Sequence, residues 1–324
     1  MRTGLISSLS FFWGKICLAI FLICLFGFSF PGLSAAAAPG HKILVSASIL
    51  PLADFCRHLG GDLVEVQTLV PPGASPHVFE PPPSVIIRAI RARVFVYTGG
   101  GLEPWADKLL ASRGPGNLEV VQAVQGIPLI QEVEAEPHGE AAHEEHESQE
   151  HHHHEGGNPH VWLDPVLAQG ICRRISAALI KVDPEHRAAY EANLQEYLQE
   201  LEGLNREIIR RVSSWRLHDF VTFHPAFAYF AKRYGLRQVG IIELAPGREP
   251  TPRHLQEIVA AIKKYGIRVV FAEPQLNPRV AEVIAGEAGV KVLLLDPVGG
   301  RPPYGNDYLK LMRYNLAVME EAMK

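Results

Sequence analysis

Hydrophobic residues follow two alternating patterns in the first half of the chain, and together they predict an α/β fold. Short β-branched and apolar runs are found at 43–47, 64–70 and 94–98, and amphipathic helical periods at 51–59, 84–92 and 166–182. Apolar runs separated by segments with helical spacing are typical of parallel strands joined by helices. We therefore expect a mostly parallel sheet with helices on both faces.

The same alternation restarts in the last third of the chain. Strands are predicted at 220–223, 238–242, 269–272 and 292–295, and helices at 226–234, 251–265, 278–288 and from about Asp307. This second series predicts a second α/β lobe with its own sheet.

A long helical period separates the two series. Asp183 is expected to be the N-cap of this helix and Pro184 its first residue. Leucine, isoleucine and valine recur at three- and four-residue steps from Leu194 to Val212, which predicts one helix to about Ser213, roughly 45 Å long. A coiled-coil dimer is one interpretation, but such a stripe more commonly faces the domains of its own chain. We expect a rigid connector between two lobes of a monomer.

The first residues have the order of a secretory signal. Arg2 and Lys15 precede an apolar run from 16 to 30, and small residues follow at 33–38. A retained membrane anchor is the weaker alternative, because a spanning helix needs roughly 20 apolar residues and this run is shorter. Leu22 and Ile23 before Cys24 do not fit a lipoprotein cleavage site. We expect a cleaved signal peptide at 1–37 and export to the periplasm.

Composition limits the class of protein. The chain has 324 residues, 47% hydrophobic and 20% charged, which is enough for two packed domains. Its net charge of -4 argues against a nucleic-acid partner. Cys56 and Cys172 are the cysteines left after the signal, and neither belongs to a CxxC zinc motif. Their positions on predicted helices fit either a disulfide or two buried free thiols.

The predicted domains follow from these elements. We expect an N-terminal lobe at 38–183, a connecting helix at 184–213 and a C-terminal lobe at 214–324. Within the first lobe, residues 132–157 are rich in glutamate and histidine and hold almost nothing apolar, so we expect a disordered loop.

Histidine is concentrated in that acidic loop. Residues 138–160 hold eight of the chain's fifteen histidines. Neutral imidazole is the commonest metal ligand among side chains, so we expect weak auxiliary metal sites in the loop. Their ligands would be His138, His143, His146, His151, His152, His153 and His154. An expression tag is disfavoured because tags lie at termini, and an acidic linker with incidental histidines is the other alternative.

Four further candidates share one kind of position. His77 lies in a proline-rich loop after a predicted strand, His160 in the motif NPHVWLDP, and His224 and Asp296 each lie between a strand and a proline. Open α/β sheets bind ligands beyond the carboxyl ends of their strands. Three imidazoles and a carboxylate suit tetrahedral zinc, and we expect the metal in the cleft between the lobes. Glu273, which also ends a strand, is the second candidate for the carboxylate.

These motifs resemble those of the exported receptors of zinc and manganese ABC transporters, also called metal-specific solute-binding proteins. The resemblance covers nearly the whole mature chain and rests on Pro76-His77, on 158–165, on 223–226, on 271–275 and on 295–299. It implies that His77, His160, His224 and Asp296 bind the metal, and that the long helix is a stiff connector between lobes that move little on binding.

The resemblance also implies a function and its partners. A protein of this family would bind Zn²⁺ outside the cytoplasm and deliver it to a membrane permease with a cytoplasmic ATPase. Two departures are visible in this sequence. Some zinc members have an acidic residue where this chain has Pro76, and some have a disulfide in the second lobe, where this chain has no cysteine.

Three other functions compete with a zinc receptor. A manganese or iron receptor of the same family is disfavoured because His224 stands where manganese receptors commonly have a glutamate, and nitrogen ligands suit zinc better. A zinc hydrolase lacks support: His143 and His146 are three residues apart rather than four, and no GxSxG motif is present. We therefore expect no enzyme. A metal-dependent adhesin is the third alternative. The chain also has no P-loop, so transport energy must come from the partners.

Overall fold

The computed structural model describes residues 42–112, 116–131, 157–243 and 250–324. All of them lie in one compact unit, from His41 to Lys324. The predicted signal peptide and the histidine-rich loop, with its seven auxiliary histidines, lie outside the described residues. Among the described helices, none combines the length and the apolar character that crossing a membrane requires.

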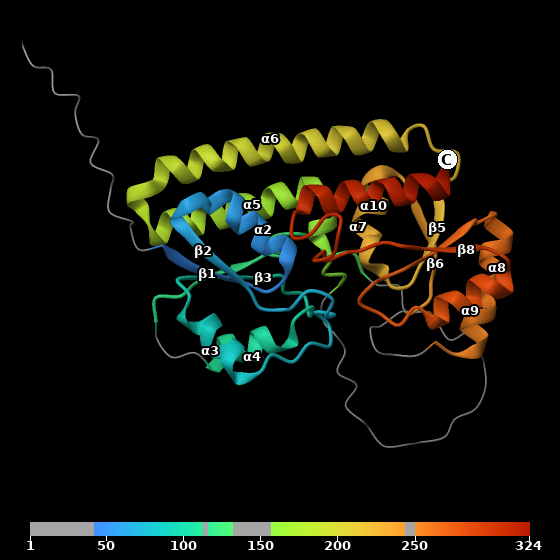
Figure 1. The fold of residues 1–324 in the computed structure, drawn as a ribbon, viewed down its shortest axis with the longest axis horizontal. Coiled ribbons are helices and arrows are strands. Elements are labelled where there is room, and N and C mark those ends of the chain that lie inside the picture. The colour runs from blue at the N-terminus through green and yellow to red at the C-terminus, as the bar shows by residue number, and fades with distance from the viewer. Residues whose placement is uncertain (1–41, 113–115, 132–156, 244–249) are drawn as a thin grey trace, which may run out of the picture. The chain divides into compact units, whose positions relative to one another are not determined.

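The N-terminal sheet has four parallel strands (Figure 1). They are β1 (Ile43–Ala47), β2 (Val64–Thr68), β3 (Val94–Tyr97) and β4 (Glu119–Gln122), in the order β2-β1-β3-β4. Helices α2 (Leu50–Gly60) and α5 (Pro165–Val182) cover one face, and α3 (Pro83–Arg91) and α4 (Pro104–Ser112) the other. All four residues of β3 are buried, as expected for an apolar strand inside a parallel sheet.

The C-terminal sheet repeats this topology. Its parallel strands are β5 (Asp219–Thr222), β6 (Arg237–Ile241), β7 (Val269–Ala272) and β8 (Lys291–Leu294), in the order β6-β5-β7-β8. Its helices are α7 (Ala228–Tyr234), α8 (Pro252–Tyr265), α9 (Arg279–Ala288) and α10 (Tyr308–Met323). The predicted fold of two parallel α/β lobes joined by a long helix is confirmed, with α4 and β4 as elements that the sequence analysis missed.

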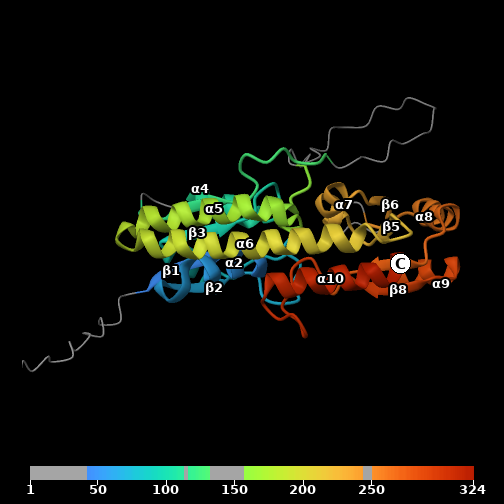
Figure 2. The same cartoon turned by 90° about the horizontal axis from the view of Figure 1, so that it is seen from above.

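The connecting helix begins as a 3-10 turn at Pro184–His186 and continues as α6 (Arg187–Val212). Asp183 precedes the turn as predicted, but its side chain makes no capping hydrogen bond to the backbone. Its Oδ2 instead accepts a hydrogen bond from the Tyr190 hydroxyl at 2.7 Å and lies 2.7 Å from Nδ1 of His186. Figures 1 and 2 show that α6 runs from α5 of the first lobe to α7 of the second.

The last helix returns toward the first lobe. Helix α10 packs against α6 and also touches α2, and the main-chain N–H of Tyr308 donates to Oδ2 of Asp54 at 2.9 Å. One buried apolar cluster includes residues of β1, β3, α5, α6, α7 and α10. A second, smaller cluster fills the space between the C-terminal sheet and helices α8 and α9. The lobes therefore share a hydrophobic core instead of meeting only at a polar interface.

Candidate metal centre

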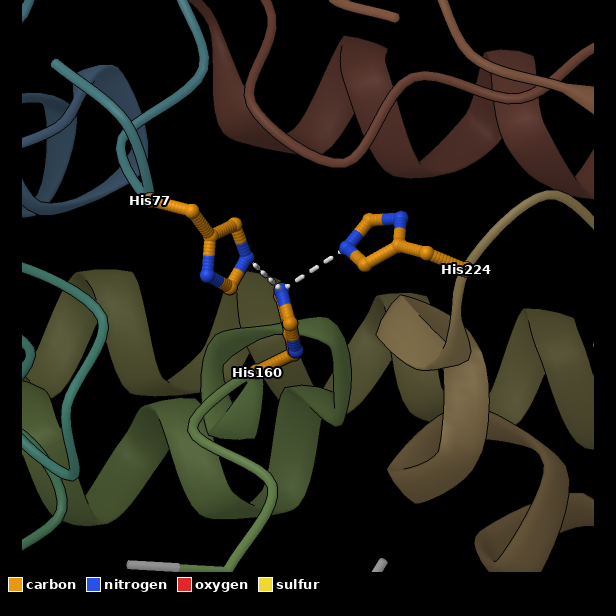
Figure 3. Close-up of side chains that lie close together, drawn as sticks. All are labelled: His77, His160 and His224. Carbon is orange, nitrogen blue, oxygen red and sulfur yellow. Dashed lines mark hydrogen bonds between the residues drawn. The ribbon is translucent and has the colours of Figure 1, made fainter. Parts of the chain in front are cut away.

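Three of the predicted histidines converge on one point. His77 follows β2, His160 precedes the 3-10 turn Val161–Leu163, and His224 lies two residues after the end of β5. Nε2 of His160 lies 3.1 Å from Nε2 of His77 and 3.1 Å from Nε2 of His224. Figure 3 shows the rings of His77 and His224 approaching the tip of His160 from opposite sides. One atom from each ring lies within 4.8 Å of the other two.

These distances suit a tetrahedral metal ion. Zn–N bonds of about 2.0–2.1 Å place two nitrogen ligands of a tetrahedral shell roughly 3.3 Å apart. His160 and His224 are buried and His77 is partly exposed. Burial, with smaller effects from His224 and His77, lowers the pKa of His160 well below 6.5. The ring of His160 is therefore neutral near pH 7, which is the form that binds metals.

Asn158 orients His160. Its Oδ1 accepts a hydrogen bond from the main-chain N–H of His160 at 3.0 Å and lies 3.0 Å from Nδ1 of the same residue. Because an amide oxygen only accepts, the ring proton belongs on Nδ1 and the lone pair on Nε2. The amide of Asn158 is buried, and its Nδ2 donates to the main-chain oxygen of Pro225 at 2.7 Å. One side chain thus contacts both His160 and the residue after His224.

Glu273 orients His224 in the same way. Oε1 of Glu273 lies 2.5 Å from Nδ1 of His224, and both side chains are almost fully buried. Burial raises the pKa of the Glu273 carboxyl, while the adjacent His224 opposes that shift. A carboxylate behind a ligating imidazole fixes the ring and increases its basicity. Glu273, the second candidate for the carboxylate ligand, is therefore engaged with the candidate ligand His224.

Asp296 lies apart from the three histidines. It is fully buried, and its Oδ1 accepts hydrogen bonds from the main-chain N–H groups of Val298 and Gly299 at 3.0 and 2.9 Å. Gln275 Nε2 and the Tyr304 hydroxyl donate to the same carboxylate at 2.7 and 2.6 Å. Within the part of the chain that the structure describes, the only group of metal-binding side chains is His77, His160 and His224. That Asp296 is the fourth ligand stays a prediction, and it requires these hydrogen bonds to be exchanged.

The space at the three rings is small. The lining residues, in chain order, are Ser75, Pro76, His77, His160, Trp162, His224, Glu273, Gln275, Leu276, Pro297 and Val298. The cavity volume is about 10 Å³, roughly what the centre of one water molecule occupies. An ion fits this volume, whereas an organic substrate does not.

The segment that carries His160 is held from the second lobe. Trp162 Nε1 donates to the main-chain oxygen of Pro297 at 2.8 Å, and the Tyr308 hydroxyl donates to the main-chain oxygen of Trp162 at 2.6 Å. Nε of Arg233 lies 2.8 Å from Oδ2 of Asp164. These contacts fix the position of the histidine relative to the loop after β8 and to helices α7 and α10.

The sequence analysis did not assign roles to Asn158, Gln275 or Trp162. Each stands in a motif that it quoted, two residues from a predicted ligand or candidate carboxylate. Adjacency to a candidate ligand was the available signal for these residues.

Comparison with known proteins identifies similar chains. Residues 45–322 match the family described as ZnuA, zinc-uptake complex component A, periplasmic. The high-affinity zinc uptake system protein ZnuA of Bacillus subtilis (strain 168) is 33% identical over 293 residues, which is 89% of this chain and 90% of that protein.

Solved structures show the same fold. A crystal structure of ZnuA superimposes with a TM-score of 0.74 at 31% identity and covers 88% of this chain and 100% of that one. The laminin-binding protein Lmb of Streptococcus agalactiae, described as bifunctional with adhesin and metal transporting activity, has a TM-score of 0.75 at 31% identity. That match covers 87% of this chain and 100% of the other.

Proposed function

Because this chain belongs to the family of periplasmic zinc-uptake complex components A, we propose that it is an extracytoplasmic zinc receptor. It binds Zn²⁺ between its lobes and delivers the ion to the membrane permease of an ABC transporter, whose cytoplasmic ATPase supplies the energy. The observation that carries the proposal is the convergence of three Nε2 atoms, from His77, His160 and His224.

The donor set favours zinc over manganese. Three imidazoles suit a borderline ion in a four-coordinate shell, while manganese prefers carboxylate and water oxygens. Manganese and iron are the alternative ions for the same cleft. The small cavity and the buried, hydrogen-bonded rings of His160 and His224 support a preformed site, so binding needs little ordering of side chains.

The histidine-rich loop adds weaker sites to this proposal. If this segment is the unstructured loop that its composition predicts, ordering it on binding would cost entropy and make its sites weaker than the cleft. Adhesion is a second candidate function, favoured by the similarity to Lmb. Binding of the purified protein to laminin, measured with and without zinc, tests that function separately.

The test of zinc binding uses protein that lacks residues 140–155, so that only the cleft is measured. Competition titration with a zinc chelator should give one tight site, and His77→Ala, His160→Ala and His224→Ala should each abolish it. His218→Ala is the matched control, because His218 is exposed and outside the cavity lining. The proposal fails if the tight site survives the three substitutions, or if the cleft holds manganese in the presence of equimolar zinc.

A further inference from the structure

Gln275, one of the residues that line the metal cavity, has a side-chain polar atom with no hydrogen-bond partner among the described residues. Its side chain helps to line the cavity that also contacts His77, His160 and His224. Nε2 of Gln275 donates to Oδ1 of Asp296 at 2.7 Å. Oε1 is buried and has no hydrogen-bond partner among the described residues. Buried polar atoms are nearly always paired with protein or water, so an isolated one calls for a ligand.

Asp296 determines which end of the amide is left for the cavity. A carboxylate only accepts hydrogen bonds, and Oδ1 of Asp296 already accepts from Val298 and Gly299. Turning the amide over would place its carbonyl oxygen against the carboxylate, where the two would repel. Asp296 itself is not among the residues that line the cavity. Of the two side chains, the one that lines the cavity is therefore the neutral Gln275, whose Oε1 is left without a donor, and not the carboxylate.

Three imidazoles leave one position of a tetrahedral zinc shell to be filled. We propose that a water molecule fills it and donates a hydrogen bond to Oε1 of Gln275, which makes Gln275 a positioning residue for the fourth ligand. Asp296 then acts on the metal through Gln275 instead of binding it. This inference rests on the proposed function, since it requires the cleft to bind zinc.

The chemistry of the parts supports this arrangement. A metal ion polarises its bound water and makes the water a stronger hydrogen-bond donor, and an amide oxygen is a suitable acceptor. Glu273 is engaged with Nδ1 of His224. Keeping the Asp296 carboxylate off the metal also withholds the type of oxygen ligand that manganese prefers.

The proposal predicts that Gln275→Met weakens zinc binding more than Asp296→Asn does. If Asp296 itself bound the metal, the opposite order would be expected. Asp296→Asn keeps an oxygen for the Gln275 amide and for the two main-chain donors, and its new NH₂ group can donate to the Tyr304 hydroxyl. We expect zinc affinity to change by less than about threefold, because the orientation of Gln275 is retained. Gln275→Met keeps the length of the side chain and removes the acceptor. We expect zinc affinity to fall about tenfold or more, as for other residues that orient metal ligands.

A control and a direct observation complete the test. Gln169→Met removes an amide that donates to Glu202 Oε2, outside the cavity lining, and should leave zinc affinity unchanged. A crystal structure of the zinc-loaded protein should show a water on the metal within hydrogen-bond distance of Oε1 of Gln275. A larger loss for Asp296→Asn than for Gln275→Met, or a carboxylate oxygen of Asp296 or Glu273 on the zinc, overturns the inference.

The failure of this inference is distinguishable from failure of the proposed function. If the proposed function is wrong, wild-type protein without residues 140–155 shows no tight zinc site. If only the inference is wrong, that tight site is present and depends on His160, while Gln275→Met binds zinc as wild type does. Melting curves of the metal-free variants establish that each one is folded before the affinities are compared.

Discussion

The side-chain amide of Asn158 donates a hydrogen bond to the main-chain oxygen of Pro225 at 2.7 Å, and so joins the loop of one candidate metal ligand, His160, to the loop of another, His224. The same side chain holds the ring and the main chain of His160 through its oxygen. Two requirements of the site, the tautomer of one ring and the separation of two loops, therefore depend on one residue.

Replacing Asn158 should weaken zinc binding in two steps. Asn158→Asp keeps the acceptor for His160 but loses the donor to Pro225, whereas Asn158→Ala loses both. We expect Asn158→Ala to lower affinity by about 10- to 100-fold and Asn158→Asp to lie between it and wild type. Chelator competition measures this. Asn193→Ala, which removes a bond to the main-chain oxygen of Leu59 away from the cavity, is the control; equal losses in all three variants would contradict the assignment.

Zinc affinity should fall as the pH is lowered, but less steeply than the affinity of a site whose three imidazoles all have the ordinary pKa. Metal binding requires neutral rings, so protons compete below the pKa of each ligand. Burial lowers the pKa of His160 well below 6.5, so this ring is already neutral at pH 6 and releases no proton there when zinc binds. The slope of the logarithm of affinity against pH equals the number of protons displaced by zinc, so three imidazoles with the ordinary pKa of about 6.5 would give a slope of about 1.5 at pH 6.5. We expect a slope clearly below that value, because His160 displaces no proton there. A slope of about 1.5 or more would contradict this, and an affinity that does not change down to about pH 5 would count against imidazole ligands.

His224→Glu should move the preference of the cleft toward manganese, because it replaces a nitrogen ligand by a carboxylate. The new glutamate would lie beside the buried carboxyl of Glu273, which now faces Nδ1 of His224. Repulsion between the two carboxylates should reduce the gain, so we expect His224→Glu with Glu273→Gln to bind manganese better than the single variant. Parallel titrations with both metals give the ratio, and a zinc-to-manganese ratio equal to that of wild type in both variants would refute the assignment.

Zinc should raise the melting temperature of the whole described unit. A ligand at a thousandfold its dissociation constant stabilises the folded state by roughly 4 kcal/mol. Because the lobes share one buried apolar cluster, we expect one cooperative transition that shifts upward as zinc is added. Calorimetry of protein without residues 140–155 tests this, with His160→Ala as the variant that should not respond. Two separate transitions, of which one ignores zinc, would contradict it.

The sequence predicted the elements whose pattern is local. The strand at 269–272 is apolar throughout, and the stripe in α6 repeats over several turns, so each predicted its type and nearly its ends. Helix α4 and strand β4 were missed because both are short, and β4 has Glu119 and Gln122 at its ends. Their structure depends on packing beside β3, which a local pattern does not record.

The candidate ligands were predictable because each histidine lies just beyond a strand or within a stiff proline motif. The arrangement of the carboxylates was not. Asp296 and Glu273 occupy similar positions in the sequence, yet one accepts four hydrogen bonds away from the cavity and the other lies behind His224. That difference depends on residues distant in sequence and on the turn at Val298 and Gly299, so it appears only in three dimensions.

The return of helix α10 to α2 has a consequence for how the protein acquires its structure. The hydrogen bond from Tyr308 to Asp54 joins residues that are 254 positions apart. Contacts of such separation slow folding, because a long loop must close before they form. A chain that emerges N-terminus first can build its first sheet early, but the side of α2 that meets α10 stays uncovered until nearly the whole chain has emerged. A chain that has not yet reached His224 holds two of the three histidines at most, and the segment that carries His160 gains its hydrogen bond from Tyr308 only after α10 has arrived.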